Sequence, residues 1–246
     1  MGDSDEIKSI RFSVFRAVDN VDACRKYIEG HIHVLKVYGI TQITSAKIDW
    51  ILNPNVYVLV VESPENNEVL AGARLQVADG KFNLPIEDAV GHHDASIYPY
   101  INGLMEEGTG ELCGLWNSRK IAGYGIGSIF LGRTSIAVAD QLNIKSLVAL
   151  CAPSTRQNCF KTGFLVEESL GVKGEFIYPK EDLVATSLII PDVNELYHAE
   201  PVERDKMFVL RENRQQTILE STKRGDVYVE YNLQIPQIES RNSVEL

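Results

Sequence analysis

A glycine-rich turn is the sequence feature with the clearest chemical meaning. Residues 122–128 read Ala-Gly-Tyr-Gly-Ile-Gly-Ser and lie between a predicted strand and a long predicted helix. Small residues allow several backbone N–H groups to point into one concavity, and the positive end of the following helix adds to their attraction for phosphate oxygens. The turn therefore predicts an anion site built from main chain. The alternative is a tight strand-to-helix turn that binds nothing.

Two common nucleotide motifs do not fit this turn. A P-loop requires Gly-Lys-Ser/Thr at its end, and no such triplet follows here. A dinucleotide fingerprint requires G-x-G-x-x-G early in a βαβ unit and an acidic residue about 20 residues later. The spacing here is G-x-G-x-G, and Pro153 follows the next predicted strand.

The charge of the chain is unevenly distributed. The 246 residues carry a net charge of −10, which argues against a nucleic-acid partner because neutralising phosphates requires a basic surface. Residues 79–111 hold seven acidic side chains and one basic one, whereas residues 113–166 hold six basic side chains and one acidic one. An anionic ligand can therefore be held by the middle of an acidic protein.

Several classes of protein are disfavoured by what the sequence lacks. No apolar run approaches the roughly 20 residues that span a bilayer, and the acidic segment 1–8 has no apolar signal-peptide core after it. The four cysteines form no CxxC pair, and His92 and His93 have no further ligands at a recognisable spacing. His31 and His33, on the first predicted helix, are expected at the surface. We expect a cytoplasmic globular protein without a membrane partner and without a metal.

The pattern of apolar residues predicts an α/β protein with a mixed central sheet flanked by helices. Alternating or continuous apolar runs predict strands at residues 9–18, 56–62, 69–77, 111–117, 146–152, 176–178, 183–190 and 227–233. Helical spacing predicts helices at residues 22–37, 45–52, 97–105, 127–142, 153–162 and 200–212. The long segment 79–110 between two strands is of a length that is usually functional or mobile.

Residues 111–164 resemble the Gcn5-related N-acetyltransferase (GNAT) superfamily. The likeness rests on a strand, a glycine turn that opens a long helix, a second strand, and a short helix that ends at Gly163-Phe164. The order of the elements before and after this region extends the resemblance over about residues 9–190. It implies a GNAT acyltransferase domain at residues 1–190 and a C-terminal extension at residues 191–246 that packs on it.

The resemblance implies that acetyl-CoA or another acyl-CoA is the acyl donor. The turn amides would hold its pyrophosphate, which assigns donor binding to Gly123, Tyr124, Gly125, Ile126, Gly127 and Ser128, and Asn158 would contact the pantetheine arm. The sequence departs from the family pattern at two positions. Ala122 stands where the family has Arg or Gln, and Cys159 stands where the family often has the Tyr that protonates the leaving thiolate.

Acyl transfer to an amine also requires a group that accepts the ammonium proton. Glu111, on the strand before the glycine turn, is the best candidate for this base, and a surface carboxylate at a strand end is the alternative. Cys159 is the second catalytic candidate, although no base that could activate it as a nucleophile is evident. Arg74, inside an apolar predicted strand, is either a snorkelling residue at a sheet edge or a fixed cation for a carboxylate or carrier phosphate. Trp116 would line an acyl tunnel or pack in the core.

The sequence leads to one main hypothesis and two alternatives. The main hypothesis is direct transfer of an acyl group, expected to be acetyl, from acyl-CoA to a small-molecule amine. Residues 72–75, 84–88 and 110–111 also resemble acyl-homoserine-lactone synthases and N-acyl-amino-acid synthases, which implies an acyl carrier protein as donor and partner. The other alternative is a catalytically silent GNAT-fold sensor or scaffold. A homodimer contact through the C-terminal extension is a further expectation.

Overall fold

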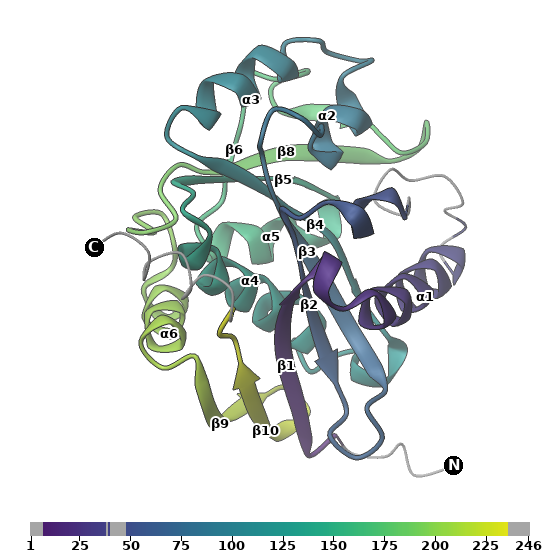
Figure 1. Ribbon diagram of the computed structural model, residues 1–246, viewed down its shortest axis with the longest axis vertical. Helices are drawn as coiled ribbons and strands as arrows, with labels where there is room; N and C mark the ends of the chain where they lie inside the picture. The colour runs from purple at the N-terminus through teal and green to yellow at the C-terminus, as the bar shows by residue number, and fades with distance from the viewer. Residues whose placement is uncertain (1–6, 38, 40–47, 236–246) are drawn as a thin grey trace.

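One mixed β-sheet organises the chain (Figure 1). The computed structural model describes residues 7–37, 39 and 48–235. The strand order is β6-β8-β5-β4-β3-β2-β1-β10-β9, and β7 pairs with β8 outside this path. The strands are β1 Ser9–Arg16, β2 Val56–Glu62, β3 Val69–Val77, β4 Thr109–Asn117, β5 Ser146–Cys151, β6 Leu165–Val166, β7 Glu175–Ile177, β8 Val184–Ile190, β9 Gln215–Thr222 and β10 Gly225–Asn232.

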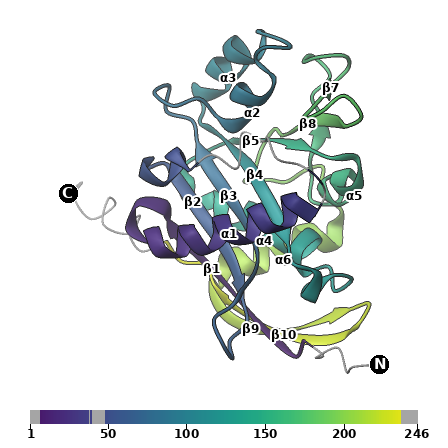
Figure 2. The ribbon, with the colours of Figure 1, turned by 90° about the vertical axis from the view of Figure 1, so that its right-hand side faces the viewer.

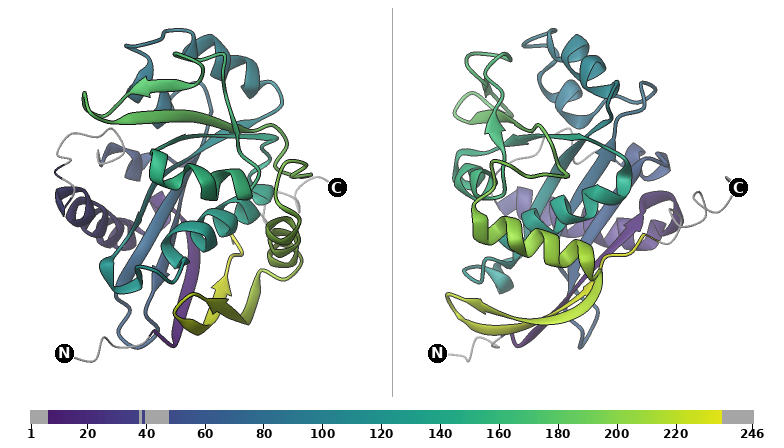
Figure 3. Two further views of the ribbon diagram at one scale, coloured as in Figure 1. Left: turned by 180° about the vertical axis from the view of Figure 1, so that it is seen from behind. Right: turned by 90° about the vertical axis from the view of Figure 1, so that its left-hand side faces the viewer.

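Helices cover both faces of the sheet. Helix α1 (Val21–Val37) crosses one face (Figure 2), and α4 (Leu131–Ala139) and α5 (Pro153–Lys161) lie behind the sheet (Figure 3). Because both faces are covered, β2 and β3 are apolar and buried along most of their length rather than alternating. Helix α6 (Pro201–Glu212) packs against α4.

The long segment before β4 contains two short helices. They are α2 (Pro85–Val90) and α3 (Ile97–Met105). Both pack on Val148 of β5 and Ile189 of β8, which are register partners in the sheet. Glu111 of β4 is paired with Val148, so its side chain leaves the sheet on the same face as α2 and α3.

The parallel pairing of β4 and β5 is short. Register partners are Thr109 with Ser146, Gly110 with Leu147 and Glu111 with Val148, after which the two strands are not paired with each other. Both strands continue on their outer sides, where β4 pairs with β3 as far as Asn117 and β5 pairs with β8 as far as Cys151. The sheet therefore opens between β4 and β5 from Glu111 onward.

The C-terminal residues extend the same sheet. Strand β10 runs parallel to β1, and β9 and β10 form a hairpin at the sheet edge. Arg133 of α4 is 1% exposed and contacts Glu220 of β9 at 2.5 Å and Glu203 of α6 at 3.4 Å. Lys206 of α6 contacts the second oxygen of Glu220 at 2.7 Å. This buried ion network ties α6 and the hairpin to α4.

Most of the predicted elements are confirmed, including α1, the β2–β3 hairpin, α3, β5 and α5. The pattern of apolar residues did not predict α2 or β9. Helix α2 is a single short element opened by Pro85, and β9 is a polar edge strand whose buried residue is Glu220. The helix predicted at residues 45–52 falls partly outside the described residues, and its described end is a 3₁₀ turn at Asp49–Leu52. Among the described residues no helix is both long enough and apolar enough to cross a membrane.

Replacing Arg133 by alanine should destabilise the protein strongly. The substitution leaves the buried carboxylate of Glu220 without its guanidinium partner, a change that typically costs about 3–5 kcal/mol of unfolding free energy. Urea denaturation should show this loss. Arg25→Ala is the matched control, because Arg25 and Asp22 form an exposed pair on α1, and it should leave the midpoint nearly unchanged. Equal midpoints for the two variants would contradict a stabilising role for the network.

Candidate active site

The glycine turn presents backbone N–H groups at the start of a helical segment. Gly123 and Gly125 have φ angles of 86° and 81°, and one π-helical turn (η5, Ile126–Phe130) leads directly into α4. Only glycine adopts such φ angles without strain. Within the described chain, the N–H groups of Gly123, Gly125, Ile126 and Gly127 have no hydrogen-bond acceptor. These four N–H groups are the donors on which the predicted anion site would depend.

Close contact between Gly127 and Asn117 places the turn at the open end of β4. A Cβ added at Gly127 would lie 2.0 Å from Cβ of Asn117, so a larger residue cannot occupy this position without displacing the strand. The side-chain hydroxyl of Ser128 donates to the carbonyl of Gly125 at 3.2 Å. Tyr124 is buried, and its hydroxyl accepts a hydrogen bond from the N–H of Ile7 at 3.2 Å. In this structure Ser128 and Tyr124 therefore support the turn through their side chains.

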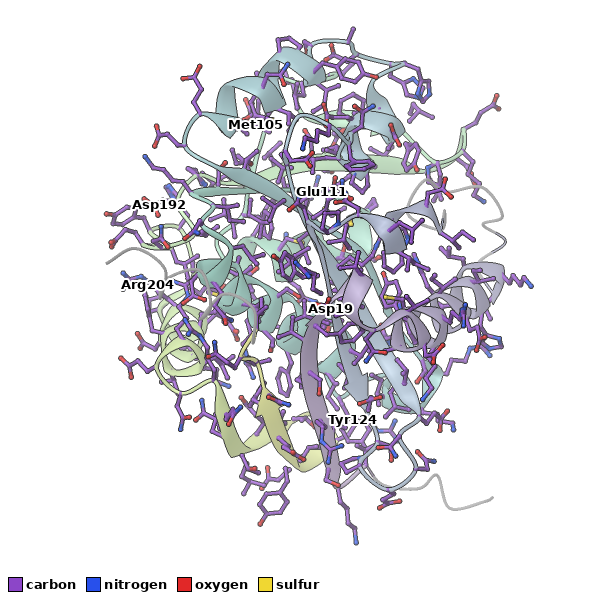
Figure 4. The ribbon with its side chains drawn as sticks, viewed as in Figure 1. Asp19, Met105, Glu111, Tyr124, Asp192 and Arg204 are labelled. Carbon is purple, nitrogen blue, oxygen red and sulfur yellow. The ribbon has the colours of Figure 1, made fainter. Side chains whose placement is uncertain are left out.

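Glu111 lies at the other end of the opening, where β4 and β5 part. Figure 4 labels Glu111 and Tyr124 and shows them well apart along the long axis of the molecule. Glu111 is near the start of β4, as the sequence placed it, and Asn117 at the far end of β4 is the residue next to the turn. Glu111 is 2% exposed, so it is not the surface carboxylate that was the alternative.

Helix α2 caps the carboxylate of Glu111. The N–H of Ile86, in the first turn of α2, donates to Oε2 of Glu111 at 2.7 Å. Burial raises the pKa of Glu111 to about 8, against the lowering effects of this hydrogen bond and of Arg74. A carboxyl group with such a pKa can accept and release a proton near neutral pH.

Arg74 is a buried cation in the middle of the sheet. Its guanidinium carbon lies 4.3 Å from the ring centroid of Trp50, and its side chain is 1% exposed. Burial disfavours the charge, but the neighbouring Cys113, Tyr27 and Glu111 outweigh this effect and raise the pKa of Arg74. The arginine therefore stays charged beside Glu111, and it is not the snorkelling edge residue that the sequence left open.

Strand β4 contains a bulge between Cys113, the partner of Arg74, and Trp116, the partner of Gly72. The register of β3 and β4 shifts between Gly72 and Arg74, and Gly114 opposite this shift has a φ of 60°. The hydroxyl of Tyr27 in α1 donates to the carbonyl of Gly114 at 2.5 Å. Trp116 is 4% exposed and packs so closely on α1 that a Cβ at Gly30 would lie 2.1 Å from its ring. Its indole N–H has no hydrogen-bond partner among the described residues.

Cys159 and Asn158 lie on α5, on the same face of the sheet as the glycine turn and α4. The thiol of Cys159 is hydrogen-bonded to Cys151 at the end of β5, and this contact together with burial raises the pKa of Cys159. The thiol therefore stays protonated at neutral pH. Asn158 is half-buried one residue away.

Sequence reasoning missed several residues around Glu111 and Arg74. His31 of α1 was expected at the surface, but it is 4% exposed, and burial lowers its pKa to about 4. The ring of Tyr27, on the same helix, packs against His31 and also against Trp50, which comes from a separate segment of the chain. The apolar spacing of α1 was the available signal, because His31 lies four residues after Tyr27 on the same helical face.

Two hollows are lined by residues from the part of the chain around α2 and α3. A cavity of about 200 Å³ is lined by residues of α2, α3 and segment 78–83, including Glu87. A wider groove of about 580 Å³ is lined by His93, Asp94, Gly171, Val172, Glu175, Phe176, Ile177 and Val184. The second, which we call the β7 groove, begins at Glu175, whose register partner Thr186 is itself paired with Cys151 at the open end of β5. The described residues contain no group of three or more side chains arranged to hold a metal ion.

Comparison with known proteins connects this geometry to a fold. No protein-family model matches the sequence. No curated protein matches it either. Among solved structures, FeeM, an N-acyl amino acid synthase from uncultured soil microbes, matches with a TM-score of 0.58 and 13% identity over 80% of this chain and 97% of its own. Escherichia coli ElaA matches with a TM-score of 0.51 and 11% identity over 73% of this chain and 98% of its own. The structural neighbours are GNAT-fold acyltransferases, and the chain has the GNAT fold.

The raised pKa of Glu111 predicts a specific dependence of stability on pH. Because the folded-state pKa of about 8 exceeds the ordinary value of 4.5, the stability associated with protonated Glu111 is complete below pH 4.5 and is lost as the pH rises to about 8. Glutamine at this position does not titrate. The free energy of unfolding of Glu111→Gln relative to wild type should therefore increase as the pH rises from 5 to 8.5. Urea denaturation at several pH values measures the difference. Glu106→Gln, at an exposed site just before β4, should show none, and equal pH slopes for wild type and Glu111→Gln would refute the assignment.

Proposed function

We propose that this protein is an N-acyltransferase that moves an acyl group from an acyl-CoA directly to an amine. The observation that carries the proposal is the opening between β4 and β5, with unsatisfied turn amides at one end and a buried carboxyl at the other. A direct transfer requires that donor and acceptor meet at one point, and a parted pair of strands lets them approach from opposite faces of the sheet. Residues 1–190 would carry this machinery, and residues 191–246 would extend it.

The dimensions of the opening suit the donor. From Asn117 to Glu111 the strand β4 spans about 20 Å at the usual rise per residue, which is comparable to an extended phosphopantetheine arm. Gly123, Gly125, Ile126 and Gly127 would bind the pyrophosphate through their N–H groups, supported by Tyr124 and Ser128. The pantetheine amides would then meet the strand edges that β4 and β5 leave unpaired, with Asn158 beside them on α5.

The chemistry of the transfer requires two proton movements. The amine nitrogen attacks the thioester carbonyl carbon, the C–S bond breaks, and the amine must lose a proton while the departing sulfur gains one. Glu111 would accept the amine proton, directly or through a water molecule, because its carboxyl is ionisable near neutral pH. Cys159, held as a thiol, would give a proton to the departing thiolate.

The acceptor would approach from the face of the sheet that carries α1, α2 and α3. Glu111 points to this face, and the β7 groove, which includes Phe176 of the cluster beneath α2 and α3, lies near the open end of β5. Hydrogen bonds from Ser96 and Gly171 lower the pKa of Asp94, so this groove residue is anionic and suits a cationic amine. An intracellular compartment such as the cytoplasm is expected, because acyl-CoA is made and used there.

The second candidate function is an N-acyl amino acid or homoserine-lactone synthase that takes its acyl group from an acyl carrier protein. The similarity to FeeM favours it, as does the apolar lining of the β7 groove, which includes Val172, Phe176 and Ile177. In this candidate the fixed charge of Arg74 would attract a carboxylate and Trp116 would border the acyl chain. Transfer from a long-chain acyl carrier protein, with no transfer from acetyl-CoA, would select it over the main proposal.

Donor binding tests the proposal first. Isothermal titration calorimetry with acetyl-CoA should show binding that Gly125→Glu abolishes, because the variant places a carboxylate beside the turn amides and imposes strain at a φ of 81°. Gly103→Glu is the matched control, because Gly103 lies in α3 with nothing within 4 Å of an added Cβ, and it should bind as wild type does. No heat from wild type with any CoA thioester would overturn the acyl-CoA proposal.

The pH dependence of turnover tests the role of Glu111. With a saturating amine, the rate of acyl transfer in wild type should rise with pH to a plateau with a midpoint near 8, because only the ionised carboxylate accepts a proton. Glu111→Gln should lower kcat by about 10²–10⁴-fold and remove this limb. The loss of free thiol from the acyl donor, followed with a thiol reagent, measures the rate. Unchanged turnover in Glu111→Gln would exclude Glu111 as the base.

A further inference from the structure

The arginine at the tip of the C-terminal hairpin lies on the glycine turn. Residues 122–128 contain no cationic side chain of their own. Arg224, in the turn between β9 and β10, donates from Nη1 to the carbonyl of Ala122 at 3.1 Å. Its guanidinium carbon lies 4.9 Å from the ring centroid of Tyr124. A residue 102 positions away in the sequence therefore brings a positive charge to the turn.

The side chain of Arg224 runs past Gly123. A Cβ added at Gly123 would lie 3.1 Å from Cδ of Arg224, so the absence of a side chain at Gly123 is what leaves room for the arginine. The N–H of Gly123 is one of the turn donors that lack an acceptor in the described chain. Main-chain donors and a guanidinium thus lie side by side at one exposed place.

The guanidinium has capacity left for an anion. It carries five N–H donors, and its recorded protein hydrogen bond in the described structure is the one to Ala122. The neighbouring Lys223 is exposed and adds a second positive charge. The nearest acid in the hairpin, Asp226, accepts a hydrogen bond from Ser221 within the same hairpin. A planar guanidinium with free donors is suited to bind two oxygens of a phosphate group together.

Two features hold the hairpin in this position. Strand β10 pairs with β1 over five residues, from Ser9 with Tyr228 to Ser13 with Asn232. Glu220, in β9, contacts the buried Arg133 of α4, which is the helix that the glycine turn opens. The tip of the hairpin and the turn are therefore fixed to the same helix, and Arg224 is presented by rigid elements rather than by a free tail.

We propose that Arg224 binds the pyrophosphate of the acyl donor, so that the C-terminal hairpin completes the donor site. This inference rests on the proposed function, because it assigns a further residue to the site formed by the turn amides. Arg224 supplies the positive charge that the turn lacks, and the amides supply the directional hydrogen bonds. The C-terminal extension is then part of the binding site as well as of the sheet.

The test compares the affinities of three ligands for wild type, Arg224→Gln and Arg224→Lys by calorimetry. CoA and 3′-dephospho-CoA both contain the pyrophosphate, whereas pantetheine contains no phosphate. Arg224→Gln should weaken binding of CoA and of dephospho-CoA by about 10- to 100-fold, since hydrogen bonds between charged groups are lost. It should leave pantetheine binding unchanged, and Arg224→Lys should recover part of the loss. Arg25→Gln, at an exposed site on α1, should bind all ligands as wild type does.

Each outcome has a distinct meaning. If wild type does not bind CoA, both the proposed acyl-CoA function and this inference fail. If wild type binds CoA and Arg224→Gln binds it equally well, the inference alone fails, and Arg224 serves only to pack on Tyr124. A loss confined to CoA, with dephospho-CoA unaffected, also overturns the assignment, since the contact would then be to the 3′-phosphate. Thermal melting of each variant without ligand verifies that the fold is retained.

Discussion

The constraint on which the rest of the structure depends is that the pairing between β4 and β5 stops early, at Glu111 and Val148. Two parallel strands in the middle of a sheet normally remain hydrogen-bonded along their length, because an unpaired buried backbone group is costly. Here the pairing stops at Glu111, and the outer neighbours β3 and β8 hold the two strands apart. The unpaired edges need partners, and an extended ligand with amide groups can provide them. The glycine turn, α2 and α5 are all arranged around this opening.

The two faces of the sheet have different electrostatic character at the opening. On one face, helix α4 directs its positive end and the turn amides toward the open end of β4, and Arg224 lies beside them. On the other face, Glu111 and Arg74 are buried next to each other beneath α1 and α2. Positively charged groups therefore gather on one face of the opening, although the chain as a whole is acidic. The buried contact between Arg133 and Glu220 joins the C-terminal hairpin to α4.

The sequence by itself determined the local features. The period-2 and apolar runs located β2, β3 and β5, and the glycine spacing located the turn that opens a helix, because these patterns report the conformation of neighbouring residues. The order of those elements was sufficient to indicate the GNAT fold, which the structural comparisons support. The sequence also showed directly that residues 79–111 are acidic and residues 113–166 are basic.

Only the tertiary structure decided which distant residues meet. Sequence reasoning selected Glu111 at the start of its strand but did not find the burial of its side chain, because the capping of its carboxylate by α2 depends on packing between segments about 25 residues apart. It treated His31 as a surface residue, because burial of one helical position depends on what lies above it. It gave no role to Arg224, which reaches the glycine turn only because β10 pairs with β1 at the far edge of the sheet. Local periodicity reflects each element's own geometry, whereas these contacts come from long-range pairing that no short pattern encodes.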